Sequence, residues 1–181
     1  MNLALVAAFV VVSCSSLILT PSALCQSTSS DPDTASFTIA GDIEVSVEDA
    51  TSFVSEITRL KIWKLTLRSP PSYKAENGRN IIVSLFFSRN FEPKPGAYPV
   101  QFSYLNAENA MGGSVVVLGN GVDMYSIDTE GEITFEVFDE RLTGSFHFVS
   151  YNGSDEDRHE VSVKGTFDCA RGNALNVVAA E

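Results

Sequence analysis

Most of the chain after residue 35 alternates apolar with polar side chains every two residues. Phe37 and Ile39 alternate with serine, threonine and alanine, and Val45 and Val47 alternate with serine and glutamate. Successive side chains of a β-strand point to opposite faces, so this pattern buries one face and leaves the other in water. The alternation therefore predicts a succession of half-buried strands, and the sequence predicts no long helix.

The alternating runs are short, and they are separated by glycine, proline, asparagine and aspartate, which favour turns. The predicted strands cover residues 36–40, 43–48, 60–68, 80–87, 97–104, 114–118, 122–127, 132–138, 142–151 and 159–169. Consecutive short strands joined mainly by hairpins are typical of antiparallel sheets. The predicted fold class is all-β, an antiparallel meander of about nine or ten strands closed as a barrel or folded as a sandwich.

Three segments depart from simple alternation. Residues 49–57 are compatible with a short helical turn capped by Asp49 or Thr51, or with a loop leading into the next strand. In residues 60–68 the alternation changes phase, which predicts a β-bulge or a break into two strands. Residues 80–87 are apolar at both parities, which indicates a central strand covered on both faces or a dimer contact.

Prolines and glycines add further predictions. Pro99 cannot donate a backbone hydrogen bond, so its strand is expected at a sheet edge or at a bulge. Residues 69–79 are expected to form a long hairpin loop, and residues 128–131 a turn. Gly144 and Gly165 occupy inward positions in strands that otherwise turn phenylalanine inward, so a sharp bend or a phenylalanine ring packed over the backbone is expected there.

The N-terminal 25 residues contain no charged side chain and include an apolar run over residues 3–12. This pattern predicts a secretory signal peptide, because polar residues interrupt it before the roughly 18 apolar residues that a membrane span needs. Lipidation at Cys14 or Cys25 is the first alternative, and an uncleaved anchor is the second. The protein is therefore expected to be secreted or extracytoplasmic, with a lipid anchor to the membrane as the alternative.

These features divide the chain into four parts. The expected organisation is a signal peptide (1–25), a polar linker (26–35), a β-domain (36–169) and a C-terminal tail (170–181). About 156 residues follow the predicted cleavage site, which is the usual size of one domain. They contain one cysteine, Cys169, so no internal disulfide is possible, and Cys169 is expected to be a small apolar residue near a strand end.

The formal net charge of −11 lies entirely after residue 25. Nucleic acids and anionic membrane surfaces bind through basic patches, so this charge argues against both as partners. Solubility outside the cytoplasm is the simpler interpretation of the acidic composition.

Four short motifs in the C-terminal half share a pattern of glycine followed by aromatic or branched residues. They are residues 95–98 (Pro-Gly-Ala-Tyr), 131–135 (Gly-Glu-Ile-Thr-Phe), 144–148 (Gly-Ser-Phe-His-Phe) and 165–167 (Gly-Thr-Phe). Over residues 95–168 the chain resembles a family of exported bacterial β-domains of unknown function, many of which are lipoproteins. It departs from that family in lacking a clean lipidation motif. The resemblance implies the fold, and it implies no chemistry.

Residues able to carry catalysis or bind metal do not form a recognisable motif. His147 and His159 could face one another on neighbouring strands, but they lack the spacing of metal-binding motifs. The acidic loop at residues 152–158 lacks the ligand spacing of a calcium loop, and it contains an Asn-Gly-Ser sequon. Glu136 and Glu160 could meet across strands as a carboxylate pair for glycoside hydrolysis. We therefore assign no catalytic residue, no metal ligand and no cofactor.

The function predicted from sequence is that of an exported, non-enzymatic β-domain with a binding or structural role. Six aromatic side chains could offer a platform for a carbohydrate or apolar ligand, although core and strand-end positions are the simpler interpretation; they are Trp63, Tyr73, Tyr98, Tyr104, Tyr125 and Tyr151. One alternative is a lipocalin-like carrier, which requires an open interior. The other is a hydrolase, which requires converging carboxylates.

Overall fold

The computed structural model of the chain describes residues 33–57, 62–88, 94–102, 110–138, 141–154 and 156–170. The predicted signal peptide, residues 26–32 of the linker and the tail after Ala170 lie outside the described residues. The described part contains ten strands and one short helix. Their bounds are β1 (Thr34–Gly41), β2 (Val45–Ile57), β3 (Ile62–Arg68), α1 (Pro71–Asn77), β4 (Asn80–Ser88), β5 (Gly96–Gln101), β6 (Gly112–Leu118), β7 (Val122–Tyr125), β8 (Ile127–Phe138), β9 (Arg141–Asn152) and β10 (His159–Ala170).

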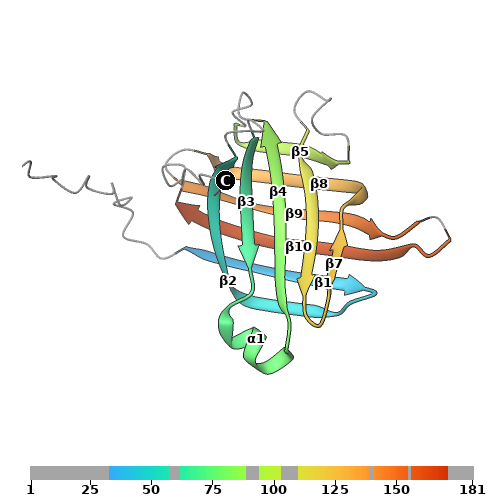
Figure 1. Cartoon of the computed structure of the whole chain (residues 1–181). Helices are drawn as coiled ribbons and strands as arrows, with labels where there is room; N and C mark the ends of the chain where they lie inside the picture. Colours follow the sequence, from blue (N-terminus) through green and yellow to red (C-terminus); the bar gives the residue numbers. More distant parts are fainter. Residues whose placement is uncertain are drawn as a thin grey trace, which may run out of the picture.

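The ten strands form one antiparallel sheet in the order β5-β8-β9-β10-β1-β2-β3-β4-β6-β7, curled into a half-barrel. The predicted all-β class is confirmed. Figure 1 shows the sheet folded into two layers, with β3, β4, β6 and β7 in front and β1, β10, β9, β8 and β5 running across behind them. We call these the front layer and the back layer.

Strand β2 belongs to both layers. Its first part pairs with β1 of the back layer, and residues 51–57 pair with β3 of the front layer. Between the two parts the register shifts, because Phe37 pairs with Val47 whereas Ala35 pairs with Ala50. One extra residue on β2 is a β-bulge, which bends a strand and increases its twist. The bulge allows a single strand to turn from one layer into the other.

The two layers also meet where β5 approaches the residue before β6. Met111 donates its backbone N–H to the Pro99 oxygen (2.8 Å) and accepts a hydrogen bond from the Gln101 N–H (2.7 Å). Strand β5 lies at the end of the strand order, so the predicted edge position of Pro99 is confirmed.

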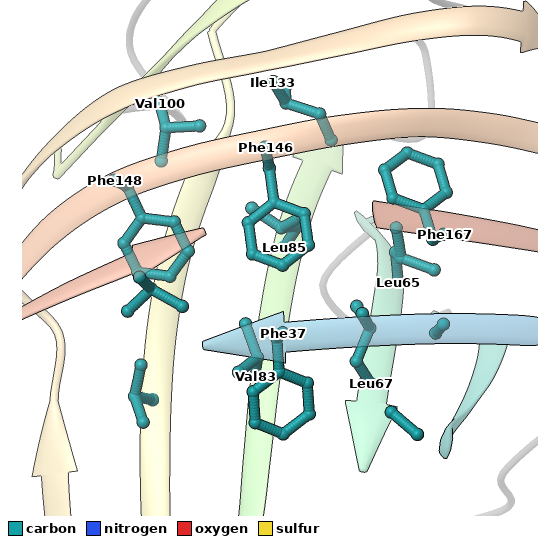
Figure 2. Packing of buried hydrophobic residues seen from close by; sticks show 14 of the residues in the cluster. Phe37, Leu65, Leu67, Val83, Leu85, Val100, Ile133, Phe146, Phe148 and Phe167 are labelled. Atoms are coloured by element: carbon teal, nitrogen blue, oxygen red, sulfur yellow. The ribbon is translucent and has the colours of Figure 1, made fainter. Parts of the chain in front are cut away.

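Large apolar side chains fill the space between the layers. Figure 2 shows Phe37, Phe146, Phe148 and Phe167 of the back layer facing Leu65, Leu67, Val83 and Leu85 of the front layer. All of these side chains are at most 3% exposed. The rings of Phe146 and Phe148 are stacked at 6.1 Å between centroids, and those of Phe146 and Phe167 at 6.4 Å.

The two inward glycines let this packing form. A Cβ on Gly165 would lie 2.7 Å from Cζ of Phe146, and one on Gly144 would lie 2.9 Å from Cζ of Phe167. The prediction that a phenylalanine ring packs over the backbone at these positions is confirmed.

Two local predictions were wrong, and a third is not confirmed in the described part of its segment. Residues 49–57 form neither a helical turn nor a loop but continue β2, whose side chains alternate between the core and the outer face. Residues 128–131 do not form a turn, because β8 runs from Ile127 with a register shift and a positive φ of 45° at Asp128. No bulge or break occurs in Ile62–Arg68, where pairing with both neighbours is regular. Leu60, on which the phase change rested, lies outside the described residues.

The loop predicted at residues 69–79 contains α1. Pro71 begins the helix, where its missing N–H costs no hydrogen bond. Gly78 ends it with a φ of 70° and donates its N–H to the Lys74 oxygen (2.8 Å). The helix is an insertion in the β3–β4 hairpin, so the predicted hairpin itself is confirmed.

Candidate functional site

A groove crosses the outer face of the back layer over β1, β10 and β9. It consists of two adjoining hollows of about 450 and 280 Å3. Ser36, Thr166 and Glu48 line both hollows. We call the two hollows together the hydroxyl groove, because serine and threonine are the most frequent residues around them, at seven of the eighteen.

Short side chains make this groove possible. Ser36, Thr166, Ser145 and Thr134 pair in register across β1, β10, β9 and β8, so they form one row on the outer face. Rows of longer side chains would cover the backbone between them, whereas these hydroxyls leave it accessible. The Ser36 and Thr166 hydroxyl groups are 3.0 Å apart and hydrogen bonded. The row therefore offers several neighbouring groups that both donate and accept hydrogen bonds.

Charged side chains stand around the hydroxyl groove. Glu48 lines both hollows, Lys164 lines the larger and Glu136 the smaller. Asp168 also lines the smaller hollow, but it is already engaged: Arg141 Nε donates to its Oδ1 at 2.7 Å, and Arg141 Nη2 lies 3.7 Å from Asp33 Oδ1. Glu48, Glu136 and Lys164 are therefore the charged groups most available to a ligand.

The two histidines do not meet. His147 of β9 lies opposite Lys164 of β10, and His159 is itself on β10, five residues from Lys164. At about 3.3 Å per residue the two histidines are therefore roughly 16 Å apart along the strands. Nδ1 of His159 lies 3.3 Å from Asp42 Oδ2, and both side chains are largely exposed. Neither histidine lines the hydroxyl groove.

The carboxylate pair considered for hydrolysis does not form. Glu136 lies on β8 opposite Thr143 and Gly144 of β9. These two residues pair in turn with Asp168 and Phe167 of β10, so Glu136 lies near that end of β10. Glu160 lies at the other end of β10, seven to eight residues away, or roughly 25 Å. The carboxylates that share a hollow are instead Glu48, Glu136 and Asp168, and their separation in sequence gave no signal of this.

The acidic loop follows β9. Gly153 adopts a φ of 91°, and Asp157 donates its N–H to the Ser154 oxygen (3.0 Å). Arg158 packs on the Tyr151 ring at 3.6 Å and pairs with Asp128 at 3.0 Å. Asp155 lies outside the described residues, and the described His, Cys, Asp and Glu side chains form no group of three that could hold a metal ion.

The aromatic residues considered as a platform are dispersed. Tyr125 is 5% exposed and Trp63 packs partly buried against the core. The Tyr98 hydroxyl exchanges hydrogen bonds of 2.8 Å with the backbone of Lys94. Tyr104 lies outside the described residues. None of the described members lines the hydroxyl groove.

Cys169 is fully buried near the end of β10, as predicted from sequence. Burial raises the pKa of its thiol to about 12, and the nearby charge of Asp33 acts in the same direction. Only the thiolate reacts readily with alkylating reagents. Cys169 is therefore expected to pack in the core and to react slowly while the protein is folded.

We expect Cys169 to resist iodoacetamide at pH 8 in the folded protein and to react once the protein is unfolded in urea, as measured by peptide mapping. The thiol ionises near its ordinary pKa of 9.0 when unfolded and near 12 when folded. The free energy of unfolding should therefore fall as pH rises from about 9 to 12. Cys169→Ala should remove that part of the pH dependence. Rapid labelling of the folded protein would contradict this account.

The described helix is too short and too polar to cross a membrane. Comparisons of the chain with protein-family models, with curated protein sequences and with solved structures returned no match. Its function is therefore argued from its own residues.

Proposed function

We propose that this protein is an exported, non-enzymatic binding domain that holds a hydroxyl-rich ligand, a carbohydrate, in the hydroxyl groove. The observation that carries the proposal is the row of short hydroxyl side chains beneath two open hollows. Sugar hydroxyl groups are both donors and acceptors, and serine and threonine match them on both counts. Glu48 and Glu136 add strong acceptors, and Lys164 adds a donor.

The remaining features favour binding over chemistry. The candidate carboxylate pair Glu136 and Glu160 is far apart, and neither histidine lines the groove, although His147 pairs with Lys164 at its edge. The interior, which a lipocalin-like carrier would need open, is occupied by Phe146, Phe148 and Phe167, each at most 3% exposed. An external groove therefore suits a ligand better than the space between the layers does.

Placement outside the cytoplasm is part of the same proposal. It rests on the uncharged, apolar N-terminal 25 residues, which fit a signal peptide. N-terminal sequencing and intact mass of protein recovered from the producing cells test it. Cleavage after Cys25 supports simple secretion, a mass increase from acyl chains supports the lipid-anchored alternative, and an intact cytoplasmic chain contradicts export.

Filling the groove should abolish ligand binding. We expect the purified chain to bind at least one member of a panel of neutral and acidic oligosaccharides, found by glycan array and quantified by calorimetry. Thr166→Tyr places a ring where both hollows meet and should weaken binding at least tenfold, or about 1.4 kcal/mol. Ser162→Tyr is the matched control, because Ser162 is exposed on the same strand and lines neither hollow.

Two results would overturn the proposal. One is the absence of binding across the panel, and the other is an equal effect of the two tyrosine substitutions. Chromatography of the bound oligosaccharide after prolonged incubation tests the non-enzymatic part. Recovery of unchanged sugar supports it, whereas cleavage would favour the hydrolase alternative with Glu48 and Glu136 as the first residues to substitute.

A further inference from the structure

The outer face of the front layer is apolar, in contrast to the hydroxyl groove on the opposite side of the molecule. Side chains at alternate positions of β2 (residues 51–57), β3, β4, β6 and β7 point away from the core. The apolar members of this set together define the apolar face, and they are Phe53, Ile57, Ile62, Ile82, Phe86, Val116, Leu118, Val122 and Met124. Phe53, Met124 and Val122 are 43%, 50% and 69% exposed.

Charge is distributed unevenly between the two outer faces. Among the described outward positions of the front layer there is no carboxylate, and the charged side chains are Lys64 and Arg68. The described outward positions of the back layer and of the first part of β2 include Glu48, Glu130, Glu132, Glu136, Glu160 and Asp168. A chain with a net charge of −11 repels its own copies, and the apolar face is where that repulsion is weakest.

The apolar face is also corrugated. Thr66, Ser84 and Ser114 form a row across β3, β4 and β6 and are only 1–4% exposed, because larger neighbours rise on either side. Lys64 lies over the Phe86 ring at 5.4 Å from its centroid. A hollow of about 180 Å3 opens where Phe86, Phe102 and Met124 surround small residues. Ridges of large side chains beside a trough of small ones allow two such faces to interdigitate.

We propose that the apolar face is the contact between two copies of this chain, related by a two-fold axis. In a two-fold contact the same patch serves both partners, so the described outward positions, which include no carboxylate, meet their own equivalents. The ridges of one copy enter the trough of the other, as in face-to-face packing of two sheets about 10 Å apart. Strand β4 has apolar residues on both of its faces, from which the sequence predicts a strand covered on both sides. In the dimer the core covers one face and the second copy covers the other.

The size of the face is sufficient for such a contact. Five strands about 4.8 Å apart and about seven residues long cover roughly 24 by 23 Å, or about 550 Å2. Two copies would bury about 1,100 Å2 together, slightly above the roughly 1,000 Å2 expected of a specific interface. An interface near this limit predicts a reversible dimer rather than a permanent one.

Dimerisation would leave both hydroxyl grooves facing outward on opposite sides. Two grooves on one particle would bind an immobilised polysaccharide with avidity. The dimer itself does not depend on what the groove binds, so the two proposals can fail separately.

Sedimentation velocity of the purified chain between 1 and 100 µM tests the contact. We expect a concentration-dependent shift from monomer to dimer. Raising the salt concentration should preserve or strengthen the dimer, because salt screens the repulsion between two acidic copies. Phe53→Glu and Met124→Glu each place a carboxylate on the apolar face and should weaken dimerisation at least tenfold. Val137→Glu is the matched control, an exposed apolar residue of β8 in the back layer.

Far-ultraviolet circular dichroism and thermal melting confirm that each variant folds. A chain that stays monomeric up to 100 µM overturns the proposal, as does equal weakening by Val137→Glu. Flotation with phosphatidylcholine vesicles tests whether the apolar face binds lipid instead. A monomer that binds vesicles through Phe53 and Met124 would assign the face to lipid and also overturn the dimer. Unchanged oligosaccharide affinity per site in the monomeric variants shows that the groove is independent.

Discussion

Replacing Phe135 with alanine is expected to lower the free energy of unfolding by about 3 to 5 kcal/mol. Phe135 is 1% exposed, and its ring makes edge contacts with those of Phe87, Tyr98 and Phe167 at centroid distances of 6.4, 6.0 and 5.8 Å. These residues come from β4, β5 and β10, so one side chain joins the front layer to two strands of the back layer. Its removal leaves a cavity that rigid strands on both sides cannot close.

Urea unfolding followed by tryptophan fluorescence and circular dichroism measures this loss. Val137→Ala is the control, because Val137 lies on the same strand but is 45% exposed and should change stability by less than about 0.5 kcal/mol. A loss below about 1 kcal/mol for Phe135→Ala would show that the layers pack differently from the arrangement in Figure 2.

Replacing Gly144 with valine is expected to cost about 3 kcal/mol or more, or to prevent folding altogether. A Cβ at this position would collide with the backbone oxygen of Thr134 on the paired strand and would lie 2.9 Å from the Phe167 ring. The ring could rotate, but the backbone oxygen belongs to the β8–β9 pairing and cannot move without breaking it.

The soluble yield of Gly144→Val and its urea midpoint test this expectation. Gly121→Ala is the control, since a Cβ there meets no atom within 4 Å. Gly144→Ala gives an intermediate test, because it meets the same oxygen with a smaller side chain. Wild-type stability of both Gly144 variants would show that β8 and β9 do not approach as closely as their register requires.

The largest errors of prediction came from segments where a strand changes layer. In residues 49–57 serines and Asp49 interrupt the apolar pattern, so the segment resembles a turn or loop. It is a strand because the bulge in β2, opposite Ala35 to Phe37 of β1, carries β2 from one layer to the other. At residues 128–131 the Asp-Thr-Glu-Gly sequence resembles a turn, yet Asp128 adopts a positive φ and the chain continues as β8. In both segments pairing with neighbouring strands of the sheet overrides the local preference.

The hydroxyl groove could not be predicted from sequence for a similar reason. Ser36, Ser145 and Thr166 are ordinary outward residues of three separate strands, and only their register places them in one row. The same holds for Glu48 and Glu136, which come from β2 and β8. A continuous trough of small residues is a property of paired strands, and each strand alone shows only alternation.

The sequence by itself determined the all-β class, most of the strand positions, the inward phenylalanines and the two glycines beneath them. These features depend on which face of a strand a residue occupies. The alternation of apolar and polar residues every two positions shows that face directly. Only the tertiary structure decided the order of the strands, the passage of β2 between layers and the segregation of polar and apolar outer faces. Those depend on which distant strands pair and in what register, a choice made by packing across the core that no local pattern encodes.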